Sequence, residues 1–461
     1  MKRDEQGAVV RHKARLVVKG YAQRQGIDFE EVYAPVACME AIRLLLALAA
    51  HQGWQVHHMD VKSAFLNGDL QEEVYVEQPP GLFDQENQHK VYRLKKALYG
   101  LHQAPRAWNQ KLNESLISLD FKKSPSEHAI YCKDENAGRL VVGVYVNDLV
   151  ITGTSIEEIQ KFKKEMAHLF KISDLGLLHY YLGIEVKQLE KGISLSQKAY
   201  AEKVLEKAGM AGCNPCKTPM VTRLKLSKRS DSPQVDATKY RSLVGSLRYL
   251  VHTRPDLAFA VGYVNRFMQE PHEEHMAAVK QILRYVAGTL NMGLFYCREK
   301  GEKPLLTGFS DSDHAGDVDE RKSTSGIIFF LGRAAISRQS MKQKVVATSS
   351  CEAEYIAAAT AACQAIWLAR VVADIMGTEV EKPMLRIDNK SAISLIKNHV
   401  LNDRSKHIDV KFHVVREYEN SGKLEVKFIG TAEQLGDILT KPLGRVKFQE
   451  VSDKIGICQV K

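Results

Sequence analysis

The order of apolar segments between residues 305 and 443 constrains the fold of this chain more than any other feature of its sequence. Short β-branched or alternating runs predict strands, and longer helical patterns ended by glycine predict helices. The expected elements are strands at 305–310, 326–331 and 335–340 with 345–348, a helix at 351–376, a strand at 385–387, helices at 391–397 and 406–418, a strand at 424–428 and a helix at 433–440. This order, β-β-β-α-β-α-α-β-α, predicts a domain of the α/β (α+β) class.

Shorter elements are expected upstream. The patterns predict a strand at 15–19, a helix at 39–51 ended by Gly53, and an extended segment at 56–61 that contains Asp60. A β-branched run at 140–152 has Asn147 and Asp148 at its centre. Such a pair indicates either a tight turn or a functional site, and a hairpin tip that displays a carboxylate satisfies both interpretations.

Composition excludes several classes of protein. The 461 residues suggest about three domains. The apolar content of 44% and the charged content of 26% exclude wholesale disorder. We find no apolar run near the roughly 18–20 residues that a bilayer requires, and no apolar segment follows the first residues, so an intracellular location, cytoplasmic or nuclear, is expected.

The cysteine content bears on the compartment of the protein, and its net charge bears on its partner. Eight scattered cysteines fit a reducing compartment better than a disulfide scaffold. Cys213 and Cys216 form one C-x-x-C pair with no second pair at zinc-finger spacing, so a plain loop is favoured over a zinc site. The net charge of +10 favours a polyanionic partner.

Four carboxylates fall at strand ends or helix starts of the downstream region, namely Asp311, Glu354, Asp388 and Asp437. Clustered carboxylates repel one another and raise each other's pKa unless cations neutralise them. Two Mg²⁺ ions about 3.5–4 Å apart would do so and would support phosphodiester hydrolysis.

Each of these acids also has a purely structural interpretation. Asp311 competes with Asp313, Asp317 and Asp319 as a turn residue. Asp388 could cap the next helix, and Asp437 could be a solvated helix residue. A capping box formed by Ser349 and Glu352 leaves Glu354 without a capping role.

Ten motifs in one order resemble copia-type LTR retrotransposon Pol polyproteins over nearly the whole chain. The ribonuclease H motifs are GFSDSDHAG (308–316), RKSTSG (321–326), SSCEAEY (349–355), IDNKSA (387–392) and DILTK (437–441). The reverse transcriptase motifs are KARLVVKG (13–20), MDVKSAFLNG (59–68), YGLHQAPRAW (99–108), YVND (145–148) and YLGIE (181–185).

The resemblance implies a right-hand polymerase followed by a ribonuclease H-like mixed sheet with flanking helices. Its expected boundaries are fingers and palm at 1–180, thumb and connection at 181–300, the ribonuclease H-like domain at 301–445 and a tail at 446–461. The family's polymerase domain begins upstream of Met1, so part of the fingers is expected to be missing. The chain would then be the C-terminal piece of a polyprotein, either a processed product or a truncated genomic copy.

In the polymerase half, the resemblance makes Asp60 and Asp148 the catalytic metal ligands. Phe65 would select deoxynucleotides, although a core phenylalanine is an equally good interpretation. The other substrate contacts that the resemblance implies are Gln103 and Arg106 for nucleotide and template, and Lys13 and Arg15 for the triphosphate.

Asn147 departs from the family, which has two adjacent aspartates at this motif. An amide oxygen is a weaker Mg²⁺ ligand than a carboxylate. Bound metal ions stabilise the charge of the transition state in such reactions by several kcal/mol. The sequence therefore predicts that RNA-directed DNA polymerisation is severely impaired.

In the nuclease half, the resemblance makes Asp311, Glu354, Asp388 and Asp437 the ligands of two Mg²⁺ ions, with Mn²⁺ as a substitute. One ion would activate water and the other would stabilise the leaving 3′ oxygen during cleavage of RNA in RNA–DNA hybrids. The implied partners are an RNA template, a DNA primer, the hybrid and deoxynucleoside triphosphates.

Alternatives to the enzyme hypothesis remain open. A non-catalytic nucleic-acid-binding relic is one, and a product that never folds stably is another. Five basic residues of the middle region could follow a phosphate backbone or simply line a solvated loop; they are Arg223, Lys225, Lys228, Arg229 and Arg241.

Overall fold

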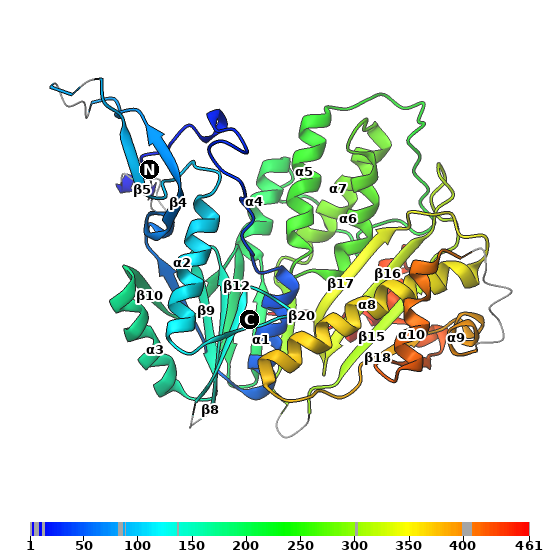
Figure 1. Ribbon diagram of the computed structural model, residues 1–461. Helices are drawn as coiled ribbons and strands as arrows, with labels where there is room; N and C mark the ends of the chain where they lie inside the picture. Colours follow the sequence, from blue (N-terminus) through cyan, green and yellow to red (C-terminus); the bar gives the residue numbers. More distant parts are fainter. Residues whose placement is uncertain are drawn as a thin grey trace. The chain divides into compact units, whose positions relative to one another are not determined.

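Two compact units make up the computed structural model, which describes residues 2–3, 9–11, 14–81, 86–87, 89–135, 138–299, 303–398 and 408–460 (Figure 1). Unit 1 takes residues 1–37 and 57–176, and unit 2 takes 38–56 and 177–461. Helix α1 (Met39–Gln52) therefore folds with unit 2, although its sequence lies between two parts of unit 1.

Unit 1 is built on a six-stranded sheet. Its strands, in spatial order, are β10 (Ile172–Leu177), β3 (Val56–Val61), β9 (Asp148–Gly153), β8 (Gly138–Tyr145), β7 (Ile130–Glu135) and β6 (Lys122–Lys123). Strands β8 and β9 form the hairpin expected around Asn147, with Tyr145 opposite Asp148. A separate two-stranded sheet pairs β4 (Asp69–Val76) with β5 (Tyr92–Lys96).

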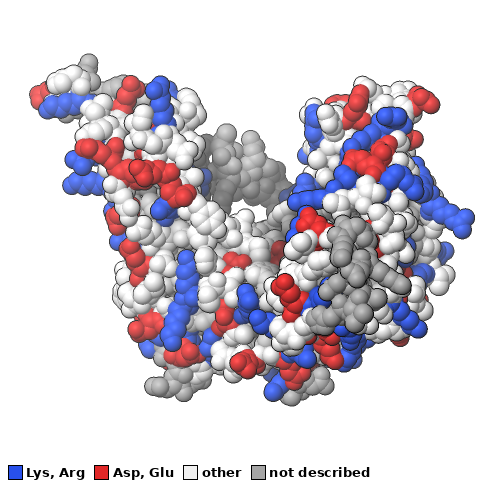
Figure 2. Space-filling model, turned by 45° about the vertical axis from the view of Figure 1, so that its right-hand side comes forward, with Lys and Arg blue, Asp and Glu red and all other residues white. Residues whose placement is uncertain are grey.

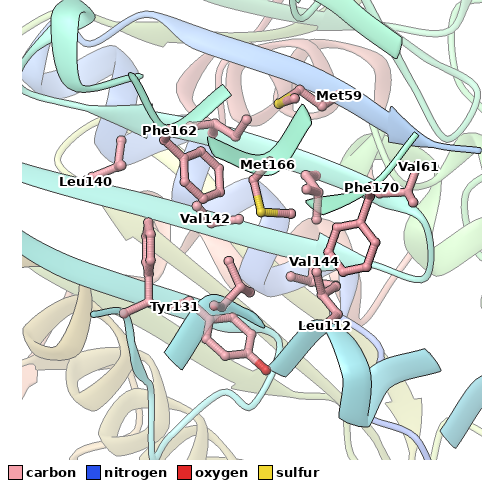
Figure 3. Packing of buried hydrophobic residues seen from close by; sticks show 14 of the residues in the cluster. Met59, Val61, Leu112, Tyr131, Leu140, Val142, Val144, Phe162, Met166 and Phe170 are labelled. Carbon is pink, nitrogen blue, oxygen red and sulfur yellow. The ribbon is translucent and has the colours of Figure 1, made fainter. Parts of the chain in front are cut away.

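Helices α2 (Ala104–Ser118) and α3 (Ile156–Leu169) contribute to one apolar core with this sheet (Figure 3). Leu140, Val142 and Val144 alternate along β8 and so present one face of the strand to the core. Phe162 and Met166 of α3 meet this face. The core fixes β3 and the β8–β9 hairpin, which carry Asp60, Asn147 and Asp148.

The strand predicted at 15–19 is absent, and this expectation was wrong. Leu16 and Val17 are 55% and 59% exposed, so the β-branched run has no sheet to pack against. Its backbone contact to a distant segment is the hydrogen bond from the Val18 amide to the Tyr99 carbonyl, at 2.8 Å. Propensity without a partner strand does not make a strand.

Unit 2 contains two five-stranded sheets. The first has the order β11 (Tyr180–Tyr181), β12 (Ile184–Leu189), β13 (Gly192–Ser196), β14 (Met292–Cys297) and β20 (Ile457–Gln459). The second has the order β17 (Ala334–Lys342), β16 (Thr324–Leu331), β15 (Leu306–Ser312), β18 (Met384–Ile387) and β19 (Glu425–Phe428). Pairing is parallel between β15, β18 and β19 and antiparallel elsewhere, which makes the second sheet mixed.

Besides α1, the helices of unit 2 lie between these strands in the sequence. They are α4 (Lys198–Ala208), α5 (Ala237–Leu250), α6 (Ala258–Val264), α7 (Glu273–Ala287), α8 (Ser350–Met376), α9 (Lys390–Lys397), α10 (Val414–Asn420) and α11 (Arg445–Lys454). Residues 345–348 form no strand, and the helix expected at 433–440 is the 3₁₀ helix η8 (Leu435–Leu439). The start of the helix expected at 406–418 lies outside the described residues.

Helix α8 corrects the expectation that no apolar segment is long enough for a bilayer. Its length and its mean hydropathy of 1.6 would allow a membrane crossing, but 67% of that window is buried inside the protein. Small residues such as Ala357, Ala358 and Ala361 are fully buried in it, which lets the helix approach the sheet closely. This burial is that of a core helix.

Candidate active sites

The topology of the mixed sheet brings three of the predicted acids to one edge. Asp311 lies near the end of β15, and Asp388 directly follows β18. These strands are parallel neighbours, so their C-terminal ends meet at the same edge. Glu354 lies in the second turn of α8, next to that edge, and the Ser312 amide donates to its Oε1 at 3.2 Å.

Ligand atoms of Asp311, Glu354 and Asp388 all lie within 4.8 Å of one another. Among the described residues, no other group of three or more such side chains is this close. Burial and the neighbouring carboxylates raise the pKa of Glu354 to about 9. Burial also raises the pKa of Asp311 to about 6, partly opposed by Lys441. The cluster therefore favours a bound cation over three free carboxylates.

Asp437 joins the cluster through Lys441. The Lys441 Nζ lies 2.6 Å from Asp437 Oδ1 and 3.8 Å from Asp311 Oδ2. The Thr440 hydroxyl donates to Asp311. Sequence reasoning assigned no role to Thr440 or Lys441, although the four-residue spacing between Asp437 and Lys441 is that of a helical ion pair.

The structural alternatives apply to neighbouring residues rather than to this cluster. Asn389, not Asp388, caps α9, by accepting from the Ala392 amide at 2.9 Å. Glu352 accepts from the Thr348 amide at 2.8 Å, before the start of α8. Three acids of the 313–319 loop have their own partners: Asp313 accepts from Thr324, Asp317 pairs with Arg266 and Lys342, and Asp319 accepts from Ser227 and Lys228.

In unit 1, the β8–β9 turn is held in a conformation unusual for its residues. Val146 has φ +56°, which a β-branched side chain rarely adopts. The Trp108 indole nitrogen donates to the Val146 carbonyl at 2.7 Å. The Val61 amide donates to the Asn147 carbonyl at 2.9 Å, so the turn lies beside the end of β3.

The two acids at this turn are occupied by partners from the same unit. Asn147 donates its side-chain amide to Asp60 Oδ1 at 2.5 Å. Lys62 forms an ion pair with the other Asp60 oxygen. The His58 Nε2 lies 3.0 Å from Asp148 Oδ1. Sequence reasoning named neither Lys62 nor His58.

The remaining polymerase candidates differ in exposure. Phe65 is partly buried, with its ring 5.1 Å from that of Tyr99. Gln103 is only 1% exposed. Its Oε1 accepts from the Gln23 side-chain amide, and its Nε2 donates to the Asp28 carbonyl. In this conformation Gln103 therefore holds the 20–28 segment rather than facing solvent.

The three basic candidates fall in different surroundings. The Arg15 guanidinium lies 5.2 Å from the centre of the Tyr99 ring. Arg106 lines a cavity of about 390 Å³ on one face of α2, together with Asn109 and Lys123. Lys13 lies outside the described residues.

The Cys213–Cys216 pair lies in a loop. The Cys216 sulfur lies 3.3 Å from both the Thr218 and the Gln281 carbonyl oxygens. None of the eight cysteines forms a disulfide in the part of the chain that the structure describes.

Comparison with known proteins identifies the family. Residues 1–222 match the profile of the reverse transcriptase (RNA-dependent DNA polymerase) family. The chain is 40% identical to the Retrovirus-related Pol polyprotein from transposon RE1 of Arabidopsis thaliana, over 100% of this chain and 31% of that protein. It is 41% identical to the corresponding polyprotein from transposon TNT 1-94 of Nicotiana tabacum, over 99% of this chain and 35% of that protein.

A shorter relative is matched over almost its full length. The putative transposon Ty5-1 protein of Saccharomyces cerevisiae is 34% identical, over 65% of this chain and 98% of that protein. A solved N-terminal RNase H domain from Mycobacterium tuberculosis, fused to maltose-binding protein, matches at 9% identity with a TM-score of 0.22, over 33% of this chain and 98% of that one. The chain spans about a third of the Pol polyproteins. It belongs to the copia-type retrotransposon Pol family.

Proposed function

We propose that unit 2 hydrolyses the RNA strand of RNA–DNA hybrids with two Mg²⁺ ions held by Asp311, Glu354, Asp388 and Asp437. The observation that carries this proposal is the convergence of three of these carboxylates within 4.8 Å. Family membership supplies the substrate class, and a net charge of +10 suits a nucleic acid.

The donor set suits hard divalent cations. Carboxylate oxygens are the ligands that Mg²⁺ and Mn²⁺ prefer, and the buried Glu354 Oε2 has no hydrogen-bond partner among the described residues. When bound, the metal pair would supply an activated water and stabilise the leaving 3′ oxygen. Thr440 orients Asp311 through its hydroxyl. Lys441 offsets the negative charge of Asp437 and Asp311.

We further propose that residues 1–180 are the fingers and palm of an RNA-directed DNA polymerase with impaired activity. Residues 181–300 would then be thumb and connection, 301–445 the ribonuclease H-like domain and 446–461 its tail, although the last segment contributes α11 and β20. Template, primer and deoxynucleoside triphosphates are the corresponding substrates. The Asn147–Asp60 hydrogen bond supports impairment, because it directs an N–H group at a carboxylate that would hold metal.

The nuclease proposal is tested with a labelled RNA strand in an RNA–DNA hybrid and Mg²⁺. Cleavage by the unaltered chain is expected, and Asp388→Asn should reduce its rate about 100-fold or more, because a metal ligand is lost. Asp231→Asn is the matched control, since Asp231 is an exposed residue of the same unit. No cleavage by a chain that melts cooperatively would refute the proposal.

A second candidate function is that of a nucleic-acid-binding relic without catalytic activity. Unit 1 favours it, because Lys62, Asn147 and His58 satisfy Asp60 and Asp148 without metal. Unit 2 disfavours it, because the buried Glu354 Oε2 of the converging carboxylates has no hydrogen-bond partner among the described residues. Hybrid binding without cleavage in Mg²⁺ would select this alternative.

A further inference from the structure

A cavity of about 550 Å³ in unit 2 lies on the same face of the mixed sheet as Asp311. Thr307 and Phe309 line it and alternate with Gly308, so they share a face of β15 with Asp311. Arg386 of β18 pairs with Phe309 in the parallel register. The cavity therefore begins one pleat, roughly 7 Å along the strands, before the carboxylates.

One wall of this cavity is aromatic. Phe295, Phe309 and Phe330 come from three strands of the two sheets of unit 2. The rings of Phe309 and Phe330 meet edge to face, with centroids 5.7 Å apart. Leu435 of η8 completes the apolar lining. Such a wall suits a flat ring, because nucleobases stack on aromatic side chains in a way that tolerates any base.

The charged lining groups are mostly basic. Arg333, Arg386 and Lys454 line the cavity, against one carboxylate, Asp453. The Arg386 guanidinium lies over the Phe309 ring at 5.7 Å, and its buried Nε has no hydrogen-bond partner among the described residues. A buried donor without a partner calls for a missing acceptor, and a phosphate oxygen is the strongest acceptor for a guanidinium.

We propose that this cavity binds a nucleoside monophosphate group, with the base against Phe295 and Phe330 and the phosphate on Arg386. Its volume lies within the range of about 300–1,000 Å³ typical of small-molecule sites. The group could belong to a free nucleotide or to the end of a nucleic-acid strand, since both present the same base and phosphate. This site is separate from the four carboxylates of the proposed nuclease.

The test measures binding of 5′-AMP, adenosine and inorganic phosphate to the full chain by calorimetry. EDTA is present so that metal-bound phosphate does not contribute. AMP is expected to bind more tightly than adenosine or phosphate. Arg386→Gln should weaken AMP about tenfold or more, through loss of a charge-assisted hydrogen bond, and should leave adenosine nearly unchanged.

The matched control is Arg370→Gln, which removes an exposed arginine from α8 and should leave AMP binding unchanged. If Arg386→Gln does not fold, Lys454→Gln at the cavity rim should still weaken AMP several-fold. A 5′-phosphorylated tetranucleotide that binds more tightly than AMP identifies a strand end, and equal or weaker binding identifies a free nucleotide.

Two results would overturn the proposal: no AMP binding by a chain that melts cooperatively, or equal affinity in the Arg386→Gln variant. Phosphate binding as tight as AMP would overturn the role of the aromatic wall. Failure of the nuclease is distinguishable, because Asp388→Asn should reduce cleavage about 100-fold or more while leaving AMP binding in EDTA intact.

Discussion

The side-chain nitrogen of Asn147 determines the surroundings of the Asp60 carboxylate. This nitrogen lies 2.5 Å from Asp60 Oδ1, at a turn that Trp108 and β3 hold in place. An aspartate there would instead place two carboxylates side by side, and a cation would be needed to keep both charged. Under the proposed function, the same residue stabilises the metal-free turn and opposes metal binding.

Asn147→Asp should restore polymerisation. We expect primer extension on an RNA template to rise about 100-fold or more, since a metal-ligand change is worth several kcal/mol. RNA cleavage in unit 2 serves as the internal control and should not change. An unaltered chain that extends primers as fast as the variant would contradict this prediction.

The raised pKa of Glu354 leads to a prediction about the stability of the folded chain rather than about its activity. Because its pKa is raised to about 9, the folded state binds a proton that the unfolded chain releases near its ordinary value of 4.5. In EDTA, stability should therefore fall as pH rises from about 4.5 to about 9. Glu354→Gln should weaken this dependence, leaving the part that the raised pKa of Asp311 contributes, and should raise Tm at pH 8, by about 2–4 °C for each kcal/mol gained.

Thermal melts at pH 5 and pH 8, with and without Mg²⁺, check this expectation. Mg²⁺ should raise Tm of the unaltered chain more than that of the variant, because the variant lacks one ligand. Glu206→Gln, an exposed residue of α4, is the control and should behave as the unaltered chain. A flat pH profile of the unaltered chain in EDTA would show that Glu354 is not strained by its neighbours.

At the scale of elements, α1 and β17 meet in unit 2 with two arginines between them, Arg43, which is buried, and Arg338, which is half-buried. The Arg43 Nε donates to the Ile336 carbonyl at 2.7 Å, and its Nη2 pairs with Glu40 at 2.8 Å. Arg338 donates to the Val251 carbonyl, but its buried Nε and Nη1 have no partner among the described residues. Burial and the neighbouring Arg43 lower the pKa of Arg338 to about 9.

Arg338→Met should therefore stabilise unit 2. Each buried donor without a partner costs about 1–3 kcal/mol, and methionine fills a similar volume without that cost. The expected gain appears as a higher midpoint in urea, with an unchanged slope. Arg333→Met, on the exposed turn before β17, is the control, and a loss of stability in Arg338→Met would contradict the prediction.

The sequence predicts the five strands of the mixed sheet well, because each strand there is apolar on a face that a helix covers. It predicts Asp311, Glu354 and Asp388 as neighbours, because strand ends and helix starts meet at a sheet edge. It fails where the packing partner of a segment is distant in the sequence. The 15–19 run has no strand to pair with, and α1 packs in unit 2 although the segments on either side of it belong to unit 1. Lys441 and His58 were missed, because their roles depend on contacts that spacing alone does not show.

For the molecule as a whole, net charge alone does not locate a nucleic-acid surface. In the view of Figure 2, Lys and Arg side chains are interspersed with Asp and Glu rather than gathered in one field. Several basic residues are already neutralised; Lys228, for example, pairs with Glu320 at 2.8 Å. Exposed bases without an acidic partner are the better candidates for phosphate contacts.

Arg223, Lys225 and Arg229 meet this condition. All three are exposed, in the segment between α4 and α5, and none has an ion pair with a described residue. Each phosphate contact contributes about 0.9 to the slope of log affinity against log salt concentration. Replacing all three with glutamine should therefore lower that slope for an RNA–DNA hybrid by up to about 3 and weaken binding at low salt.

Binding is measured by fluorescence anisotropy at several salt concentrations in EDTA, so that cleavage does not interfere. Lys198, Lys203 and Lys207 of α4, changed together to glutamine, provide a control with the same loss of charge. If the control lowers the slope equally, the effect is one of net charge and the segment has no special role. If neither set changes the slope, residues 223–229 form a solvated loop, and the polyanion contacts lie elsewhere on the chain.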